Sequence, residues 1–280
     1  MMIVYDTGHV SSEIVCAAMA EGFGCDVAVP PWSRPLETPA AFYGRERGTL
    51  AIVAQCAVDG NHWIMADNGY IGARQYDGYY KLSRDGFQCD GTGIPDEKRL
   101  VDVLTLTGQK FVTDWRPLRK NGHVLICPPI AGYERTHWFS GTLWLRAISK
   151  QIRKLTKRKV RLRYKPGDNR AADRPLAADL KDCHAVITHD SNIAVEAIMA
   201  GVPVFITGTS PAQVFGNVDL STIAEPRIQG DRWEWLSILA NNQWTLNEIR
   251  DGMANETLSK HKVRYENRRG SGTAVGVMHR

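Results

Sequence analysis

The sequence predicts an α/β fold with two Rossmann-like domains that face a central cleft. Short apolar runs rich in β-branched residues alternate with helix-forming segments, which is typical of parallel sheets. The chain opens with a strand, a helix and a second strand, and a further strand–helix–strand unit lies within residues 180–206. A length of 280 residues allows one large or two small domains.

The opening unit consists of a strand over residues 2–7, a helix over about 13–21 and a strand over 25–29. Gly22 and Gly24 end the helix. The turn contains no GxGxxG sequence, so it is not a dinucleotide-binding fingerprint.

The apolar run 48–58 fits a strand or a buried helix, and we expect a strand beginning near Thr49. Residues 62–66 predict a clearer strand, which ends at the turn Asp67-Asn68-Gly69. Residues 74–83 then mix aromatic and cationic side chains, as a surface that meets sugars or nucleobases does, and they equally suit an edge strand.

A boundary near residue 121 divides the chain into an N-terminal domain, residues 1–121, and a C-terminal domain, residues 122–258. The second domain starts with a strand over 123–127, an amphipathic helix over 141–155 and an alternating strand over 160–164. Residues 259–280 predict a basic, flexible tail.

The most informative unit follows. A helix over 176–182 leads into the buried strand 185–188, and a second helix begins after an N-cap at Ser191 or Asp190. Gly201 ends that helix, and residues 202–206 form the next strand. Later helices are expected over 233–240 and 245–253, where Thr245 and Glu248 have the spacing of a capping box.

The composition is that of a soluble globular enzyme, with 43% hydrophobic and 23% charged residues. No apolar run reaches the roughly 20 residues that a membrane helix needs, so we expect no stable membrane insertion. We expect no export signal, because the first residues show neither the basic nor the apolar region of one and enter a strand at once. The six cysteines form no CxxC pair, which favours reduced thiols in the cytoplasm.

The formal net charge is +5, and the excess of positive charge is concentrated in one segment. Residues 146–170 contain eleven Lys or Arg and one acidic residue, Asp168. This basic block predicts a positive field that serves a diphosphate, a polyanion such as DNA, or both. A solvated basic helix face is the alternative.

Glu196 indicates what the strand–helix–strand unit within residues 180–206 binds. It lies about one turn into its helix, on the side that Ser191 and Asn192 border. A carboxylate there accepts two hydrogen bonds from a ribose diol, while Ser191, Asn192, the neighbouring His189 and the helix amides meet a diphosphate. The pattern predicts a nucleotide-sugar site, with an ordinary solvated helix residue as the alternative for Glu196.

The same residues carry a family resemblance. Ser191, Asn192, the pair Glu196-Ala197 and the run Gly201-Val202-Pro203 are similar to the donor-binding segment of GT-B glycosyltransferases over about 20 residues. The resemblance implies a GT-B-like fold, a nucleotide-diphosphate sugar as donor with UDP-sugars first, and no required cofactor or metal. It also implies that residues 1–121 are the acceptor-side domain and residues 122–258 the nucleotide-sugar-binding domain. The sequence contains no DxD motif.

The resemblance also implies roles for residues elsewhere. Lys165, in a Lys-Pro pair at a strand end, is expected to meet the diphosphate, and the loop containing Gly132 to approach the donor phosphates from the other side. His9 lies on the first loop, where some of these families place a catalytic base; capping or packing at the turn is the alternative.

Asp67 is the first choice of base. An inverting transferase needs a group that takes the proton of the acceptor hydroxyl, and a strand-end aspartate facing the cleft is well placed for this. Ordinary turn chemistry explains Asp67 equally well.

The sequence therefore predicts a glycosyltransferase. A compact, basic chain of this kind also resembles bacteriophage DNA glycosyltransferases, so the expected acceptor is a 5-hydroxymethyl-pyrimidine in duplex DNA, exposed by base flipping. For a phage-encoded protein, the expected location is the host cytoplasm. A cell-surface glycan precursor at the inner membrane face is the alternative acceptor. A non-catalytic nucleic-acid-binding protein and a sugar-nucleotide epimerase of the same fold are alternatives of other classes.

Overall fold

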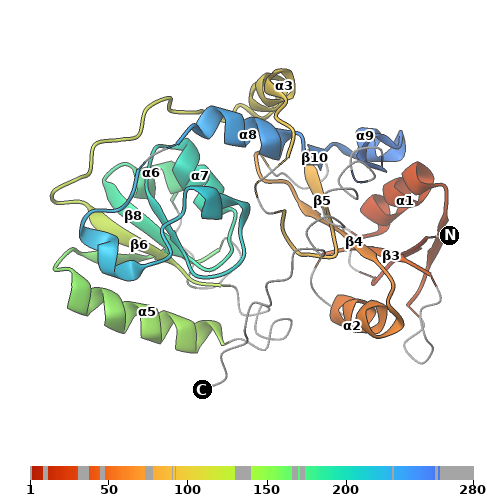
Figure 1. The fold of residues 1–280 in the computed structure, drawn as a ribbon, viewed down its shortest axis with the longest axis horizontal. Helices are drawn as coiled ribbons and strands as arrows, with labels where there is room; N and C mark the ends of the chain where they lie inside the picture. The colour runs from red at the N-terminus through yellow and green to blue at the C-terminus, as the bar shows by residue number, and fades with distance from the viewer. Residues whose placement is uncertain are drawn as a thin grey trace, which may run out of the picture.

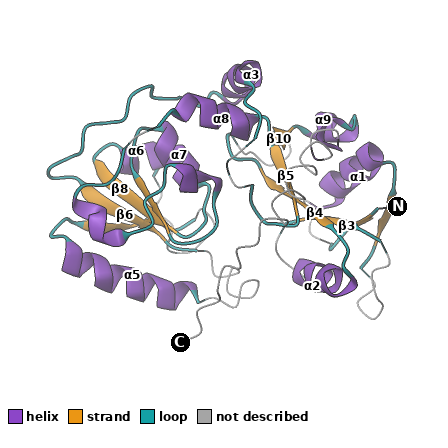
Figure 2. Cartoon of the chain, in the orientation of Figure 1, coloured by secondary structure: helices purple, strands orange, loops and turns teal. Residues whose placement is uncertain are grey.

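A computed structural model shows two β-sheets flanked by helices (Figure 1, Figure 2). It describes residues 2–8, 12–30, 38–44, 48–72, 78–89, 91, 93–129, 140–165, 170, 174–228, 230–255 and 258. Within these ranges, no helix combines the length and the apolar character needed to cross a membrane.

The first sheet has the order β10-β5-β4-β3-β1-β2. Strands β1, β2, β3 and β4 are parallel, whereas β5 and β10 run antiparallel to their neighbours. Its elements are β1 (Ile3–Tyr5), α1 (Ser12–Phe23), β2 (Asp26–Ala28), β3 (Ala40–Tyr43), α2 (Thr49–Asp59), β4 (Trp63–Asn68), β5 (Tyr80–Arg84) and β10 (Gln243–Trp244).

The two faces of this sheet are covered by different helices because successive side chains of a strand point to opposite sides. Val4 and Ile64 pack with α1, whereas Tyr5 and Met65 pack with α2. Figure 1 shows α1 and α2 on opposite sides of the strands. The opening strand–helix–strand unit is thus confirmed.

The second sheet is fully parallel, in the order β7-β6-β8-β9. Val124 and Ile126 pack against α5, and Leu125 and Val186 pack on the other face with α7 and α8. The elements from the linker to the last helix are α3 (Glu97–Thr107), β6 (His123–Cys127), α5 (Gly141–Leu155), β7 (Val160–Leu162), α6 (Leu176–Leu180), β8 (Cys183–Thr188), α7 (Ile193–Met199), β9 (Val204–Ile206), η1 (Pro211–Val214), η2 (Leu220–Ala224), α8 (Arg232–Ala240) and α9 (Leu246–Arg250).

The run after Gly48 forms helix α2, so the expected strand was wrong. Its buried residues Thr49, Ile52 and Cys56 are spaced three and four apart, which is the period of one helix face. Gly60 ends the helix in the left-handed conformation, with φ of 69°, and its N–H donates to the carbonyl of Cys56. Alanine and glutamine between the apolar positions favour the helix.

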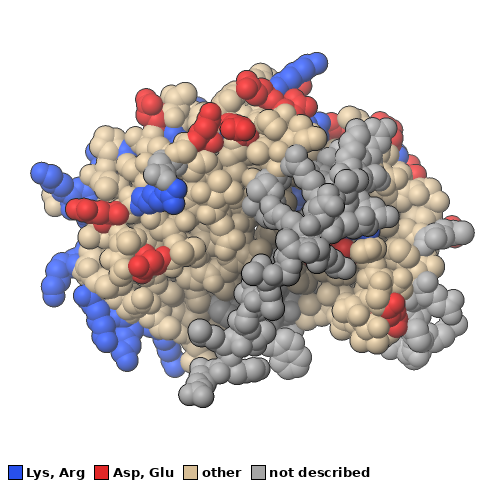
Figure 3. Space-filling view, in the orientation of Figure 1, with Lys and Arg blue, Asp and Glu red and all other residues tan. Residues whose placement is uncertain are grey.

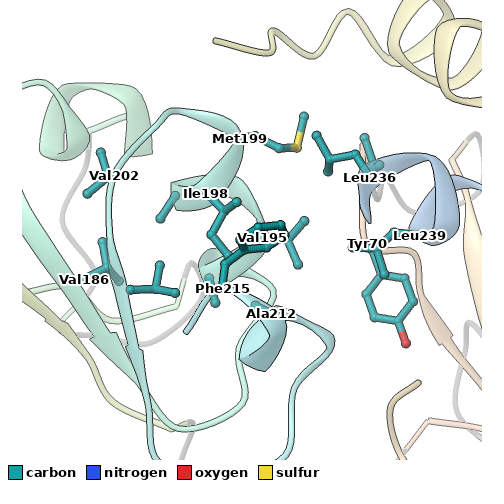
Figure 4. Packing of buried hydrophobic residues seen from close by; sticks show 14 of the residues in the cluster. Tyr70, Val186, Val195, Ile198, Met199, Val202, Ala212, Phe215, Leu236 and Leu239 are labelled. Carbon is teal, nitrogen blue, oxygen red and sulfur yellow. The ribbon is translucent and has the colours of Figure 1, made fainter. Parts of the chain in front are cut away.

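After α8 the chain returns to the first sheet. Trp244 of β10 pairs with Tyr80 of β5, and α9 packs on α1. The capping box of Thr245 and Glu248 is confirmed at the start of α9. Figure 4 shows Leu236 and Leu239 of α8 beside Tyr70, which follows β4, and one apolar cluster joins these residues to α7 and to Leu125 and Val186 of the second sheet. The domain boundary near residue 121 stays a prediction. Strand β10 follows this boundary in the sequence although it belongs to the first sheet.

Two buried histidines make the second sheet sensitive to acid. Burial, and then the positive charge of Arg161, lower the pKa of His123; burial and Arg158 lower the pKa of His184. Both rings are neutral in the fold, whereas the unfolded chain protonates them near pH 6.5. Stability from these residues is therefore present above about pH 6.5 and is lost as the pH falls. We expect the urea concentration at the unfolding midpoint to be lower at pH 5 than at pH 7.

The variant His184→Asn tests this origin, because it removes one titrating group. Its midpoint is expected to depend less on pH than that of the unchanged chain. His62→Gln is the matched control, since His62 is exposed beside Asp85. An unchanged pH slope in His184→Asn would assign the acid sensitivity to other groups.

Candidate active site

Two turns from different sheets meet in this protein. Strand β4 ends at Asn68, and β8 ends at Thr188, each at the carboxyl edge of its parallel strands. The side-chain amide of Asn192 donates to the carbonyl of Gly69 over 2.9 Å, and Gln88 Nε2 donates to the carbonyl of Asp190 over 3.4 Å. Asp67 and Asn68 are the last residues of β4 and pair with Lys81 and Tyr80, so the expected turn begins only at Gly69. The structure thus brings the turn that follows Asp67 (the Asp67 turn) and the predicted donor turn together.

The Asp67 turn is held from the far end of the chain. Gln243, fully buried in β10, accepts hydrogen bonds from the backbone N–H groups of Tyr70 and Ile71 and donates to the carbonyl of Ile71. At Gly69, a Cβ atom would lie 2.7 Å from the carbonyl of Tyr79 and 3.0 Å from Gln243 Oε1. Only glycine fits there, so Gly69 lets the turn pack closely enough to meet Asn192.

Asp67 lies beside a buried lysine. Its Oδ1 accepts from the N–H of Asn68 over 2.8 Å, and its Oδ2 lies 3.8 Å from Lys81 Nζ. Lys81 is 1% exposed, donates to Gln88 Oε1 over 2.6 Å and lies 4.7 Å from the ring centroid of Tyr70. A buried ammonium there balances the carboxylate charge.

Sequence reasoning missed Lys81 because it treated the residue as part of an exposed or edge segment. Strand β5 has a partner on each side, β4 and β10, and four of its five residues are buried. The edge-strand interpretation of Tyr80–Leu82 was therefore wrong. An aspartate directly opposite in the antiparallel register, Asp67, pairs with this lysine.

Glu196 lies on the exposed side of α7. Surrounding protein desolvates its carboxyl and raises the pKa, and the nearby charge of Arg163 lowers it in part. The group is therefore accessible to water and at the same time close to other protein atoms. A carboxyl that binds a ligand needs both properties.

Arg163 belongs to a charged cluster that sequence reasoning did not single out. Its guanidinium donates to Asp179 Oδ2 over 2.6 Å and to the carbonyl of Arg174 over 3.1 Å. Asp179 is fully buried, and its second oxygen meets the guanidinium of Arg174. The cluster fixes a cation on the side of Glu196. The signal in the sequence was weak because Arg163 is one cation among eleven.

His189 is fixed at the end of β8. Its Nδ1 lies 3.0 Å from Thr207 Oγ1, which also accepts from Trp144 Nε1 over 2.8 Å. The rings of Trp144 and His189 meet edge to face with centroids 6.4 Å apart. A Cβ at Gly208 would come within 2.6 Å of His189 Nε2, so the absence of a side chain there makes room for the ring. The sequence indicated the turn that begins at Thr207 as a possible ligand contact, whereas it did not indicate Trp144.

The start of α7 differs from the expectation. Its N-cap is Asn192, whose side-chain oxygen accepts no capping hydrogen bond, while its side-chain NH₂ group donates to the carbonyl of Gly69. The N-cap prediction at Ser191 or Asp190 was therefore wrong. Ser191 is exposed and accepts from the N–H of Ile193 over 3.4 Å. Lys165 is exposed after β7.

His9 and Gly132 lie outside the described residues. The described part of the site combines one carboxylate beside a buried cation with a second carboxyl, an imidazole and two cations on the facing sheet. Such an arrangement can hold a charged, hydroxyl-bearing ligand and take a proton from it.

The members of the basic block on helix α5 have a different position from Arg163 and Lys165. The exposed members of the block on and just after α5 are Arg146, Lys150, Arg153, Lys154 and Lys157. Figure 3 shows Lys and Arg side chains along the edge of the molecule where Figure 1 places α5. This is the outer surface of the second sheet.

No protein-family model matches the sequence, and no curated protein sequence is significantly similar to it. Two solved structures are similar in fold, both of KpsC from Thermosulfurimonas dismutans. The β-Kdo 2,7 transferase aligns with a TM-score of 0.54 and 12% identity, over 91% of this chain and 99% of its own. The β-Kdo 2,4 transferase aligns with a TM-score of 0.51 and 10% identity, over 85% of this chain and 89% of its own. The chain therefore has the predicted GT-B-like α/β fold, with two Rossmann-like units.

Proposed function

We propose that this protein is a glycosyltransferase that moves a sugar from a nucleotide sugar to a hydroxyl group, between the carboxyl edges of its two sheets. The observation that carries the proposal is the contact of Asn192 with Gly69, which places the Asp67 turn against the Glu196 segment. The fold similarity to two Kdo transferases supports the same class of reaction.

Glu196 accepts hydrogen bonds from the ribose hydroxyls in this proposal. His189, Ser191 and Asn192 line the phosphate groups, and the cations Arg163 and Lys165 balance their charge. The amide of Asn192 has a second N–H beside the one that it donates to Gly69. Gly132 belongs to the loop expected to approach the phosphates from the other side.

Asp67 acts as the general base and takes the proton of the acceptor hydroxyl as the sugar carbon is attacked. Lys81 holds this carboxylate at the end of β4 from 3.8 Å. His9 remains the alternative base. The scheme uses no metal or other cofactor.

The donor prediction, a UDP-sugar first, is tested together with GDP- and CMP-sugars, CMP-Kdo among them. We expect one of these donors to raise the melting temperature of the unchanged chain and to bind at least ten-fold more weakly to Glu196→Gln. The neutral amide keeps the size of the side chain but loses the charged acceptor. A thermal-shift titration measures both quantities.

Glu234→Gln is the matched control, because Glu234 is an exposed glutamate in the first turn of α8. It is expected to bind the donor as the unchanged chain does. If none of the donors changes the melting temperature of the unchanged chain, the nucleotide-sugar proposal is wrong.

Two acceptors are considered. The exposed cations of α5 support duplex DNA with 5-hydroxymethyl-pyrimidines, and the two Kdo transferases support a saccharide hydroxyl of a cell-surface glycan precursor. Incubation of the donor with each acceptor, followed by mass spectrometry, separates them. DNA binding that falls steeply with salt, without transfer to any acceptor, would instead favour the non-catalytic alternative.

A further inference from the structure

A recess lies away from the Asp67 turn and from Glu196, at another part of the described surface. It has a volume of about 430 Å³ and lies between the linker before β6 and the start of α8. The linker joins the C-terminal end of α7, because Val112 N–H donates to Met199 and Arg116 N–H donates to Gly201. Asn192 stands at the other end of α7. The recess is lined by Phe111, Thr113, Asp114, Trp115, Gly230, Asp231, Arg232 and Trp233.

Three aromatic rings form much of the wall, and a buried arginine fixes two of them. The guanidinium of Arg232 lies 4.5 Å from the ring of Trp115 and 5.1 Å from that of Phe111, and Trp233 packs beside Phe111 with centroids 5.6 Å apart. Arg232 donates to the carbonyls of Ile198 and Thr113, each over 2.6 Å. The rings are partly buried and held in place before any ligand binds.

Two carboxylates border the same recess. Asp114 and Asp231 are exposed. Asp231 Oδ1 accepts from the N–H groups of Trp233 and Glu234 and thereby caps α8. A carboxylate has a second oxygen, which can accept hydrogen bonds from a ligand. Against these two negative charges the lining residues carry one positive charge, on Arg232.

We infer that this recess is a binding site for a neutral saccharide. Aromatic faces pack against the C–H face of a pyranose ring, and carboxylates accept hydrogen bonds from paired hydroxyl groups. The net negative lining disfavours phosphates, nucleic acids and acidic sugars. A volume of 430 Å³ is within the roughly 300–1,000 Å³ of small-molecule sites. The inference does not depend on transferase activity.

An array of neutral and acidic glycans, probed with the full chain and no nucleotide sugar, tests it. We expect binding to neutral glycans and at least a five-fold weaker signal for Trp233→Leu and for Asp114→Asn. Asp182→Asn, which changes an exposed aspartate at another position, and Glu196→Gln are expected to bind normally. Asp114→Asn decides the matter if Trp233→Leu does not fold, since Asp114 is exposed.

The inference is overturned if no neutral glycan binds, if acidic glycans bind better, or if folded Asp114→Asn binds normally. Loss of binding in Glu196→Gln alone would also overturn it, because the saccharide would then occupy the nucleotide-sugar site. Because the array contains no donor, failure here leaves the proposed transferase reaction intact, and failure of donor binding leaves this site intact.

Discussion

Replacing Asp67 by asparagine is expected to lower the rate of sugar transfer by about 10²- to 10⁴-fold, the usual contribution of a general base. The donor is expected to bind as before, because Asp67 belongs to the other sheet from Glu196. Asparagine keeps the oxygen that accepts from the N–H of Asn68, so the turn is retained. Single-turnover transfer and donor titration measure the two effects separately.

Asp6→Asn is the matched control. Asp6 directly follows β1 in the same sheet, and its Oδ1 accepts from Gly8 N–H and from the Ser12 hydroxyl. This variant is expected to keep the transfer rate within a few-fold. His9→Gln is measured alongside, as the alternative base. Normal transfer by Asp67→Asn together with loss in His9→Gln would move the base to His9.

Replacing Arg99 by methionine is expected to lower the free energy of unfolding by about 3 kcal/mol, the cost of breaking a largely buried ion pair. Arg99 donates to both carboxylate oxygens of Glu248, over 2.7 and 2.9 Å, and to the carbonyls of Ala240 and Gln243. It therefore joins α3 to the segment that returns to the first sheet. Urea unfolding followed by circular dichroism measures the loss.

The charge of Glu248 adds a pH dependence. Burial raises the pKa of its carboxyl, but the hydrogen bonds from Arg99 and Thr245 lower it more, and the net pKa is below the usual value. The stabilisation is present above about pH 4.5 and is lost as the pH falls through the lower native pKa. In Arg99→Met the burial remains without the guanidinium, so this stabilisation shrinks.

Arg250→Met is the comparison for Arg99. Arg250 pairs with Glu21 over 3.0 Å, but the two side chains are 40% and 57% exposed, and such surface pairs contribute less than about 1 kcal/mol. If Arg99→Met and Arg250→Met lower the free energy of unfolding equally, then the apolar cluster around Leu236, and not Arg99, holds the segment that returns to the first sheet.

The sequence by itself determined the elements whose signals are local. The strand–helix–strand unit around Glu196 follows from a β-branched run, a set of helix formers and Gly201, which has a φ of 73° after α7. Asp67 at the end of β4 and the capping box of Thr245 were predicted for the same reason. The residues responsible lie within a few positions of one another.

Helix α2 shows a case in which the local sequence pattern does not distinguish a helix from a strand. The run after Gly48 is apolar almost throughout, so the periods of a strand and a helix were both present in it. The packing of Ile52 and Cys56 against Phe42 and Met65 identifies the buried face as helical.

Only the tertiary structure decided what surrounds the two candidate carboxylates. Asn192 reaches Gly69 across 123 positions, and Gln243 holds Tyr70 across 173. Lys81 is buried because β10 returns from the far end of the chain to pair with β5. Contacts over such distances leave no periodicity in the sequence, since they depend on how separately formed elements pack. Residue types and spacing therefore located Asp67 and Glu196, whereas the folded chain determined that their turns meet.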